Sequence, residues 1–155
     1  MRAAVVTIST SLARGEGQDV SGPALAALCE RAGLEVSHEV VGDDRAAIAG
    51  VLKRLADHDR VRFVFTTGGT GLTPDDVTPE ATRDVIQREA PGYAEAIRTD
   101  ARDHTPLGIL TRGVSGVRGR TLIVNFPGNP KAIDQSWPVV EPTLRHAAET
   151  LERGA

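Results

Sequence analysis

The sequence predicts an α/β protein in which helices cover both faces of a largely parallel β-sheet. Short apolar runs rich in β-branched residues alternate along the chain with stretches in which apolar residues recur every three or four positions. Strands separated by helices need crossover connections, which join parallel neighbours and place the helices on the faces of the sheet. No internal repeat or linker divides the sequence, so we expect a single domain that spans residues 1–155.

The first strand and the first helix are marked by local signals. Ala3–Ile8 is a short apolar run that suits a strand buried on both faces. Residues 21–33 predict a helix with Ser21 as the N-cap, Pro23 in the first turn and Gly33 as the stop.

The next elements repeat this alternation of strand and helix. Residues 35–41 are expected to form the second strand, and residues 61–65 the third. Between them, Asp44 can cap a helix whose apolar residues share one face. These apolar residues are Ile48, Val51, Leu52 and Leu55.

The second half of the chain is less evenly marked. Thr78 is expected to cap a helix with Pro79 in its first position, and a further helix follows Gly92. Residues 101–117 fit no clear element.

The end of the chain again predicts a strand and a helix. Residues 121–126 are expected to form a strand and residues 127–132 a tight polar connection. Residues 141–153 then predict a closing helix that starts near Pro142.

The composition is ordinary for a soluble globular protein, with 40% hydrophobic and 25% charged residues. A net charge of −3 gives no electrostatic reason to expect nucleic acid or an acidic membrane surface as a partner. Cys29 is the single cysteine, and the sequence shows neither a signal-peptide pattern nor an apolar run of membrane length. We therefore expect a cytoplasmic protein that holds any anionic ligand with local groups.

Polar loops follow the predicted parallel strands. In open α/β sheets, ligands bind beyond the carboxyl ends of the strands, where the connecting loops diverge. The loops concerned are residues 9–17, 42–44, 66–71 and 127–130. Because parallel strands end at the same edge of a sheet, these separate segments are expected to form one site.

The segment TTGGTG predicts a binding loop for an anion. Gly68, Gly69 and Gly71 lack a Cβ atom, so the backbone can take positive φ and turn successive N–H groups toward one point. Thr67 and Thr70 add hydroxyl donors, which makes a phosphate a better candidate ligand than a carboxylate. The segment matches neither a P-loop nor a dinucleotide fingerprint, and a simple turn before a helix is the alternative interpretation.

Aspartates near this loop favour a cation as well. The carboxylates of Asp75 and Asp76 would repel a bound phosphate unless a cation such as Mg²⁺ lay between them and the phosphate oxygens. Asp43, at the end of the second strand, could supply the opposite side of such a site. Taken singly, each aspartate has a structural alternative, as a helix cap for Asp43 or Asp44 and as a turn residue for Asp75.

Other polar residues give weaker signals. The four histidines have no metal-ligand spacing with each other or with Cys29, and no G-x-S-x-G elbow of a serine hydrolase is present. Four basic residues near the last strand could reach an anionic ligand: Arg112, Arg118, Arg120 and Lys131.

Two motifs together resemble a known family. Residues 66–82 (TTGGTGLTPDDVTPEAT) and residues 124–132 (VNFPGNPKA) are similar to the MogA/MoaB family of molybdenum cofactor biosynthesis, which also includes the G domain of gephyrin. The DVSG of residues 19–22 and the GDD of residues 42–44 fit the same family, so the resemblance covers essentially the whole chain.

The resemblance implies a three-layer α/β/α sandwich with a mostly parallel central sheet, assembled as a homotrimer or a hexamer. It also implies molybdopterin as the substrate, ATP as the co-substrate and Mg²⁺ as the metal ion. Active members transfer AMP to the terminal phosphate of molybdopterin and release pyrophosphate. A protein that inserts molybdate downstream is a further expected partner.

The same resemblance assigns site residues. Asp43 and Asp76 match the two functional aspartates of the family, with catalytic roles through Mg²⁺, whereas many relatives carry an aspartate at the position of Thr10. The expected contacts with substrate or ATP are Ser9, Thr67, Gly68, Gly69, Thr70, Gly71, Thr78, Pro127, Gly128, Asn129 and Pro130.

Two other functions stay open. Some MoaB-type relatives bind pterin ligands without adenylylating them, although the presence of both Asp43 and Asp76 argues against this alternative. CinA-type nucleotide hydrolases share a similar Gly-Gly-Thr-Gly loop on a related domain, and their chains usually carry additional domains.

Overall fold

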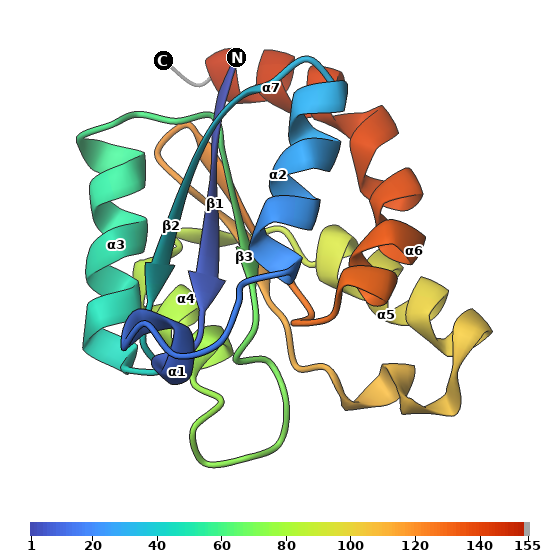
Figure 1. The fold of residues 1–155 in the computed structure, drawn as a ribbon. Coiled ribbons are helices and arrows are strands. Elements are labelled where there is room, and N and C mark those ends of the chain that lie inside the picture. The colour runs from blue at the N-terminus through green and yellow to red at the C-terminus, as the bar shows by residue number, and fades with distance from the viewer. Residues whose placement is uncertain (154–155) are drawn as a thin grey trace.

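The computed structural model describes residues 1–153 as a single sheet with helices on both of its faces (Figure 1). In chain order the elements are β1 (Arg2–Ile8), α1 (Thr10–Ala13), α2 (Ser21–Arg31), β2 (Glu35–Val41), α3 (Arg45–Asp57), β3 (Phe63–Thr67), α4 (Thr78–Val85), β4 (Arg88–Glu89), α5 (Gly92–His104), the 3₁₀ helix η1 (Pro106–Leu110), β5 (Ser115–Arg118), β6 (Thr121–Phe126), α6 (Pro130–Val140), the 3₁₀ helix η2 (Glu141–Thr143) and α7 (Leu144–Glu152).

The sheet has the strand order β2-β1-β3-β6-β5-β4. The first four strands of this order pair in parallel, which confirms the predicted largely parallel sheet. β5 runs antiparallel to β6, and β4 runs antiparallel to β5. The sequence did not predict these two strands, which form an antiparallel edge on one side of the sheet.

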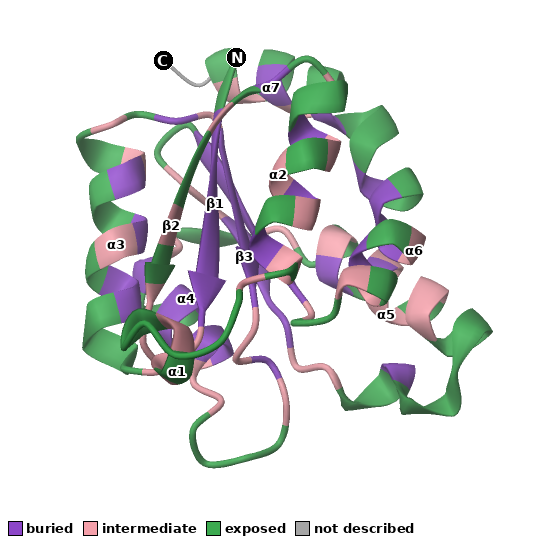
Figure 2. Ribbon diagram, viewed as in Figure 1, coloured by how far each residue is buried: buried purple, intermediate pink, exposed green. Residues whose placement is uncertain are grey.

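Two hydrophobic cores lie on opposite faces of the sheet, which confirms the three-layer sandwich (Figures 1 and 2). Successive strand residues point to opposite faces, so Val5 and Phe65 enter one core while Val6 and Val64 enter the other. Helices α2, α5, α6 and α7 cover the first core, and α3 and α4 cover the second. Trp137 packs edge-on against Phe65 with ring centroids 5.8 Å apart, which ties α6 to the centre of the sheet.

Helix starts show which local predictions were correct. Asp44 caps α3 as predicted, because its side chain accepts a hydrogen bond of 2.8 Å from the Ala47 N–H. Ser21 is not a cap but the first residue of α2, and the Asp19 carboxylate accepts from the Gly22 N–H instead. Thr78 is likewise the first residue of α4 rather than its cap.

Several boundaries differ from the prediction. The third strand was expected at residues 61–65 but runs over Phe63–Thr67, because the two threonines that follow the apolar run are also buried in the sheet. Helix α6 occupies part of the expected polar connection, and the Asn129 side chain caps it by accepting from the Lys131 N–H at 2.8 Å. The unassigned residues 101–117 hold the end of α5, then η1 and the start of β5.

Candidate functional site

Four loops begin at the same level along one edge of the sheet. The strand register pairs Ile8 of β1 with Val41 of β2, and it pairs Thr67 of β3 with Phe126 of β6. The parallel strands therefore end together, as the sequence predicted (Figure 1). β1 lies between β2 and β3, so the strand order reverses there, and such a switch point is where open α/β sheets bind ligands.

The glycine loop after β3 has the backbone of an anion-binding nest. Gly68 and Gly69 have φ values of +100° and +68°, which favour glycine. A Cβ atom on Gly68 would lie 2.4 Å from the Ile8 carbonyl oxygen, and one on Gly69 would lie 2.3 Å from Thr78 Oγ1. Within residues 1–153, the backbone N–H groups of residues 68–71 donate to no protein acceptor. These N–H groups remain available for an external anion.

Gly71 has a different role from the one expected. It does not share the positive φ of the two preceding glycines. A Cβ atom at Gly71 would lie 2.8 Å from Asp76 Oδ2, so the glycine makes room for that carboxylate.

The threonine hydroxyls around the nest hold the loops in place. Thr67 Oγ1 donates to the Pro127 carbonyl at 2.8 Å, which ties the glycine loop to the loop after β6. Thr78 Oγ1 donates to the Gly68 carbonyl at 3.0 Å, and Thr70 Oγ1 accepts from Thr111 at 3.2 Å. Thr67, Thr70 and Thr78, which are predicted to contact the ligand, also use their hydroxyls in these bonds within the protein.

A cleft of about 390 Å³ opens between the loops after β1, β3 and β6. Of the predicted site residues, it brings together Ser9, Thr67, Gly68, Gly69, Gly128 and Pro130. It is also lined by Thr7, Ile8 and Leu12 and by residues 18–21, none of which was predicted to contact a ligand. The sequence signal that could have indicated a role for this segment is Asp19, a carboxylate three residues before Gly22 at the start of a helix.

Asp19 belongs to a polar cluster at the wall of this cleft. Its Oδ2 atom lies 3.2 Å from His38 Nε2, which in turn lies 2.8 Å from Thr7 Oγ1. A Cβ atom on Gly22 would come within 2.2 to 2.5 Å of all three side chains, so only glycine allows the cluster to close. The cluster fixes the start of α2 against β1 and β2.

The two predicted catalytic aspartates lie outside the lining of the cleft, and each is held by a threonine. Asp43 Oδ2 accepts from both the backbone N–H and the hydroxyl of Thr10, each at 2.9 Å. Asp76 Oδ2 accepts from the backbone N–H and hydroxyl of Thr73 at 3.0 and 2.7 Å. Both aspartates are half-buried, and Asp75 is exposed.

The fit of a magnesium ion can be tested on these contacts. Among residues 1–153, no group of three or more His, Cys, Asp or Glu side chains could hold a metal ion by itself. Within the same residues, Oδ1 of Asp43 and Oδ1 of Asp76 have no hydrogen-bond donor. Mg²⁺ in nucleotide sites uses one or two carboxylates together with substrate phosphates, so each aspartate, taken singly, has the free oxygen that this mode requires.

Arg112 braces the glycine loop from outside the cleft. Its guanidinium donates to the carbonyls of Gly71 and Asp76, each at 2.8 Å, and pairs with both oxygens of Glu80. The hydrogen bond from Arg112 lowers the pKa of the Glu80 carboxyl and raises that of Arg112. The guanidinium of Arg112, which was predicted to reach an anionic ligand, is thus engaged by the glycine loop and Glu80.

Two of the other basic residues lie away from the loops. Arg118 ends β5 and pairs with Asp57 at 2.8 Å, and Arg120 lies in the turn before β6, at the opposite edge of the sheet. Lys131, in the first turn of α6, is the remaining basic residue beside the cleft edge.

These features define a class: an α/β protein whose parallel sheet presents a glycine nest and two aspartates at its carboxyl edge. The profile of the family described as a probable molybdopterin binding domain matches residues 4–146, and the chain belongs to this family. No helix among residues 1–153 has the length and apolar character needed to cross a membrane.

Relatives and solved structures agree with this assignment. The chain is 34% identical to the molybdopterin adenylyltransferase of Helicobacter pylori strain J99, over 95% of this chain and 85% of that protein. It is 36% identical to the molybdenum cofactor synthesis protein cinnamon of Drosophila melanogaster, of which it spans only 25%. The structure of the molybdopterin biosynthesis enzyme MoaB from Thermus thermophilus superimposes with a TM-score of 0.90 at 43% identity, covering 97% of this chain and 95% of that one.

Proposed function

We propose that this protein is a molybdopterin adenylyltransferase of molybdenum cofactor biosynthesis, which uses Mg²⁺ and ATP to form adenylyl-molybdopterin and pyrophosphate. The observation that carries the proposal is the nest of unpaired N–H groups at residues 68–71, set beside a cleft at the switch point of the sheet. Relatives named molybdopterin adenylyltransferase, from Helicobacter pylori and Escherichia coli, share 34% and 37% of their aligned residues with this chain.

The chemistry needs positioning more than acid–base catalysis. An oxygen of the terminal phosphate of molybdopterin attacks the α-phosphorus of ATP. A new P–O bond forms as the bond to the bridging oxygen breaks, and pyrophosphate leaves with the electron pair. The attacking phosphate is already charged near neutral pH, so no strong base is required. What the protein must supply is alignment of two anionic groups and relief of their repulsion.

The residues of this chain divide that task. The N–H groups of residues 68–71 would bind phosphate oxygens and lower the cost of bringing two anions together. Asp43 and Asp76 would hold Mg²⁺, which when bound neutralises charge on the triphosphate. Thr10 and Thr73 fix one oxygen of each carboxylate, so the free oxygens are oriented before the ligand arrives.

The remaining predicted contacts would act through the loop after β6. Gly128 and Pro130 line the cleft, while Pro127 accepts from Thr67 and Asn129 caps α6. A Cβ atom on Gly128 would lie 3.1 Å from Gly68 Cα, so this loop and the nest are in close contact. We assign Ser9, whose side chain caps α1 and lines the cleft, to the same ligand-facing group.

One assay tests the proposal against its two alternatives. Purified protein is mixed with ATP, Mg²⁺ and molybdopterin, and release of pyrophosphate is followed. An adenylyltransferase releases pyrophosphate only when molybdopterin is present. A pterin-binding protein without activity releases none, and a CinA-like hydrolase consumes nucleotide without molybdopterin. The structure of the Thermoplasma acidophilum CinA protein is 18% identical to this chain with a TM-score of 0.66, which establishes only a shared fold.

We further propose that the chain assembles as a homotrimer or a dimer of trimers. Three apolar side chains of η1 are exposed to solvent in the single chain: Leu107 (68%), Ile109 (62%) and Leu110 (43%). Apolar surface of this kind is often covered by a partner. Light scattering at micromolar concentration should therefore give three or six times the 16.4 kDa of one chain. A 16.4 kDa species would reject the assembly and leave the catalytic proposal intact.

A further inference from the structure

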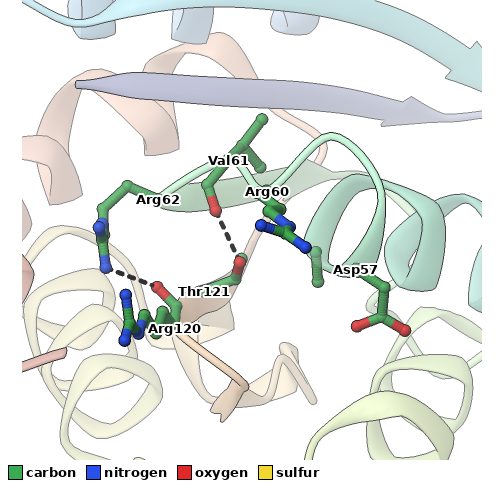
Figure 3. Close-up of a pocket in the computed structure, with 7 residues that line it drawn as sticks. Asp57, Arg60, Val61, Arg62, Arg120 and Thr121 are labelled. Atoms are coloured by element: carbon green, nitrogen blue, oxygen red, sulfur yellow. Dashed lines mark hydrogen bonds between the residues drawn. The ribbon is translucent and has the colours of Figure 1, made fainter. Parts of the chain in front are cut away.

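Arginines gather at the edge of the sheet opposite the candidate site. A pocket of about 570 Å³ lies where β3 and β6 begin, lined by Ala56, Asp57, Arg60, Val61, Arg62, Arg120 and Thr121 (Figure 3). About 20 Å of extended strand separates Arg62 from Gly68, since each residue advances the chain by about 3.3 Å. This pocket is therefore distinct from the glycine nest.

Hydrogen bonds hold the walls of the pocket together. Thr121 Oγ1 donates to the Val61 carbonyl at 2.6 Å, and the Leu122 N–H donates to the Arg62 carbonyl at 3.0 Å. The guanidinium of Arg62 donates to the Arg120 carbonyl at 3.1 Å, as Figure 3 shows. The two segments that carry the arginines are thus fixed relative to each other before any ligand binds.

Positive charge in this pocket exceeds the negative charge that faces it. Glu152 is shared between Arg62, with which it forms an ion pair, and Arg120 at 3.8 Å. The other carboxylate that faces the pocket, that of Asp57, forms an ion pair with Arg118 at 2.8 Å. Within residues 1–153, Arg60 has no acidic partner. Arg62 and Arg120 thus share one carboxylate and Arg60 has none among the described residues, in a chain whose formal net charge is −3.

The positive charges of Arg62 and Arg120 repel each other. Burial and the neighbouring charge of Arg120 lower the pKa of the Arg62 guanidinium. Like charges held together in a fixed pocket are stabilised by an anion placed between them. The guanidinium fork suits phosphate oxygens, which it can bind through two parallel hydrogen bonds.

The backbone of Arg60 gives an independent indication. Among residues 1–153 it is the single non-glycine residue with positive φ, at 51°. A side chain with a Cβ atom is strained in this region, and glycine or asparagine would relieve the strain. Strained residues of this kind concentrate at ligand-binding sites. An arginine here suggests that the guanidinium is needed at that point of the pocket.

We propose that this pocket binds a small oligophosphate anion, with the guanidinium groups of Arg60, Arg62 and Arg120 as its ligands. Free pyrophosphate and the phosphate chain of a nucleotide share the required chemistry. A single carboxylate would leave most of the donors unused. The site does not depend on adenylyl transfer, so failure of the catalytic assay would leave it unaffected.

Residue-level NMR on the full-length protein can test the site, because phosphate groups are expected to bind the glycine nest as well. Labelled protein is titrated with pyrophosphate and, separately, with ATP, in the absence of Mg²⁺ and at constant ionic strength. Saturable shifts are expected for the amides of residues 60–62 and 120–121, separately from those of residues 68–71. Whether pyrophosphate or ATP saturates the pocket at lower concentration identifies the source of the phosphate.

Two variants make the test specific. Arg60→Gly removes the guanidinium and relieves the positive φ, so the protein should melt at the same or a higher temperature while the pocket binds pyrophosphate at least about tenfold more weakly. Arg145→Gln removes the same charge from an exposed position of α7, where the side chain is 91% accessible, and should leave pocket binding unchanged. Absence of saturable shifts in the pocket with both anions would overturn the proposal, as would equal weakening in the two variants or the same shifts with sodium chloride.

Discussion

The two edges of the sheet present their polar groups in different ways. At the carboxyl edge, the groups that face the ligand space of the nest are backbone N–H donors on glycines, and nearby hydroxyls are used to fasten loops together. At the amino edge, the polar groups are the long side chains of Arg60, Arg62 and Arg120, carried on the segments that precede β3 and β6.

The difference follows from how the strands are connected. The carboxyl-edge connection after β3, residues 68–77, is long enough to fold back on itself, and its glycines allow main-chain N–H groups to point at one place. In the amino-edge segment before β3, the backbone groups of Val61 and Arg62 already form hydrogen bonds within the protein, so side chains are the groups that remain for a ligand. Backbone donors on a fixed loop are suited to aligning reacting groups, whereas flexible arginines are suited to binding.

The largest expected effect is on catalysis at the carboxyl edge. Asp76→Asn should lower the rate of pyrophosphate release by about 10²–10⁴-fold, because it removes a charged metal ligand that acts on the transition state. An asparagine oxygen can still accept from Thr73, so the free energy of unfolding should fall by only about 1 kcal/mol or less. Kinetics at saturating Mg²⁺ and urea unfolding give the two numbers.

The neighbouring exposed residue provides the control for this prediction. Asp75→Asn makes the same chemical change one position earlier and should leave the rate within a fewfold of the original. Near-normal turnover of Asp76→Asn, or equal losses in both variants, would remove Asp76 from the mechanism.

The next effect concerns the nest itself. Gly69→Val should weaken binding of ATP by about 100-fold or more, equivalent to roughly 3 kcal/mol. The new side chain would meet Thr78 Oγ1, with Cβ only 2.3 Å away, and valine resists the φ of +68°. Calorimetric titration measures the affinity.

Gly33→Val separates the loss of binding from backbone strain. Gly33 has a φ of +85° at the end of α2, with nothing within 4 Å of a Cβ atom. Its substitution should cost stability through strain, roughly 1–2 kcal/mol, and leave ATP affinity unchanged. If Gly69→Val binds ATP as tightly as Gly33→Val does, the nest is not the phosphate site.

Local patterns were sufficient to predict the parts of the fold that depend on neighbours in sequence. The cap of α3 by Asp44 and the buried face of that helix follow from spacing alone. Helix α6 was not predicted, because residues 127–132 were interpreted as a tight polar connection, whereas Pro130 lies in the opening turn of the helix. Burial of Trp137 in the core stabilises the helix and outweighs the local conformational preference of the sequence.

The same distinction holds for the candidate site. The positive φ of Gly68 and Gly69 was predicted because glycine permits it, whereas the same prediction failed at Gly71, since residue type permits this conformation without requiring it. The bonds from Thr10 to Asp43 join positions 33 residues apart, and they depend on the pairing of β1 with β2. Similarly, nothing in the sequence indicated that Arg112 would turn away from the ligand space to pair with Glu80.

A smaller effect is expected from replacing Arg112, which holds the glycine loop through its hydrogen bonds. Arg112→Lys keeps the charge but loses the planar fork that reaches two carbonyls and a carboxylate at once. The free energy of unfolding should fall by about 1–2 kcal/mol, and KM for ATP should rise several-fold as the loop loosens. Arg45→Lys alters the exposed pair with Asp84 and should cost less than about 0.5 kcal/mol. Equal costs in the two variants would show that Arg112 has no special role in holding the loop.

The smallest effect is a pH dependence carried by Glu80. Because the hydrogen bond from Arg112 lowers the pKa of Glu80 in the folded protein, folding favours the ionised carboxylate. This contribution is fully present above the pKa of the unfolded chain, near 4.3, and is lost as the pH falls through the lower folded value. Between pH 5 and pH 3, the original protein should therefore lose more stability than Glu80→Gln. The difference should be only a few tenths of a kcal/mol, since Glu80 is 31% exposed and solvent screens the pair.

Urea unfolding at the two pH values measures how much the ionisation of Glu80 contributes to stability. Repeating it in an Arg112→Gln background completes a double-mutant cycle. Without the guanidinium donor, replacing Glu80 should no longer change the pH dependence in this way. A difference that persisted in that background would mean that groups other than Arg112 set the ionisation of Glu80. The carboxyl-edge loop would then be held by its backbone bonds and threonines alone, without help from the charged pair outside it.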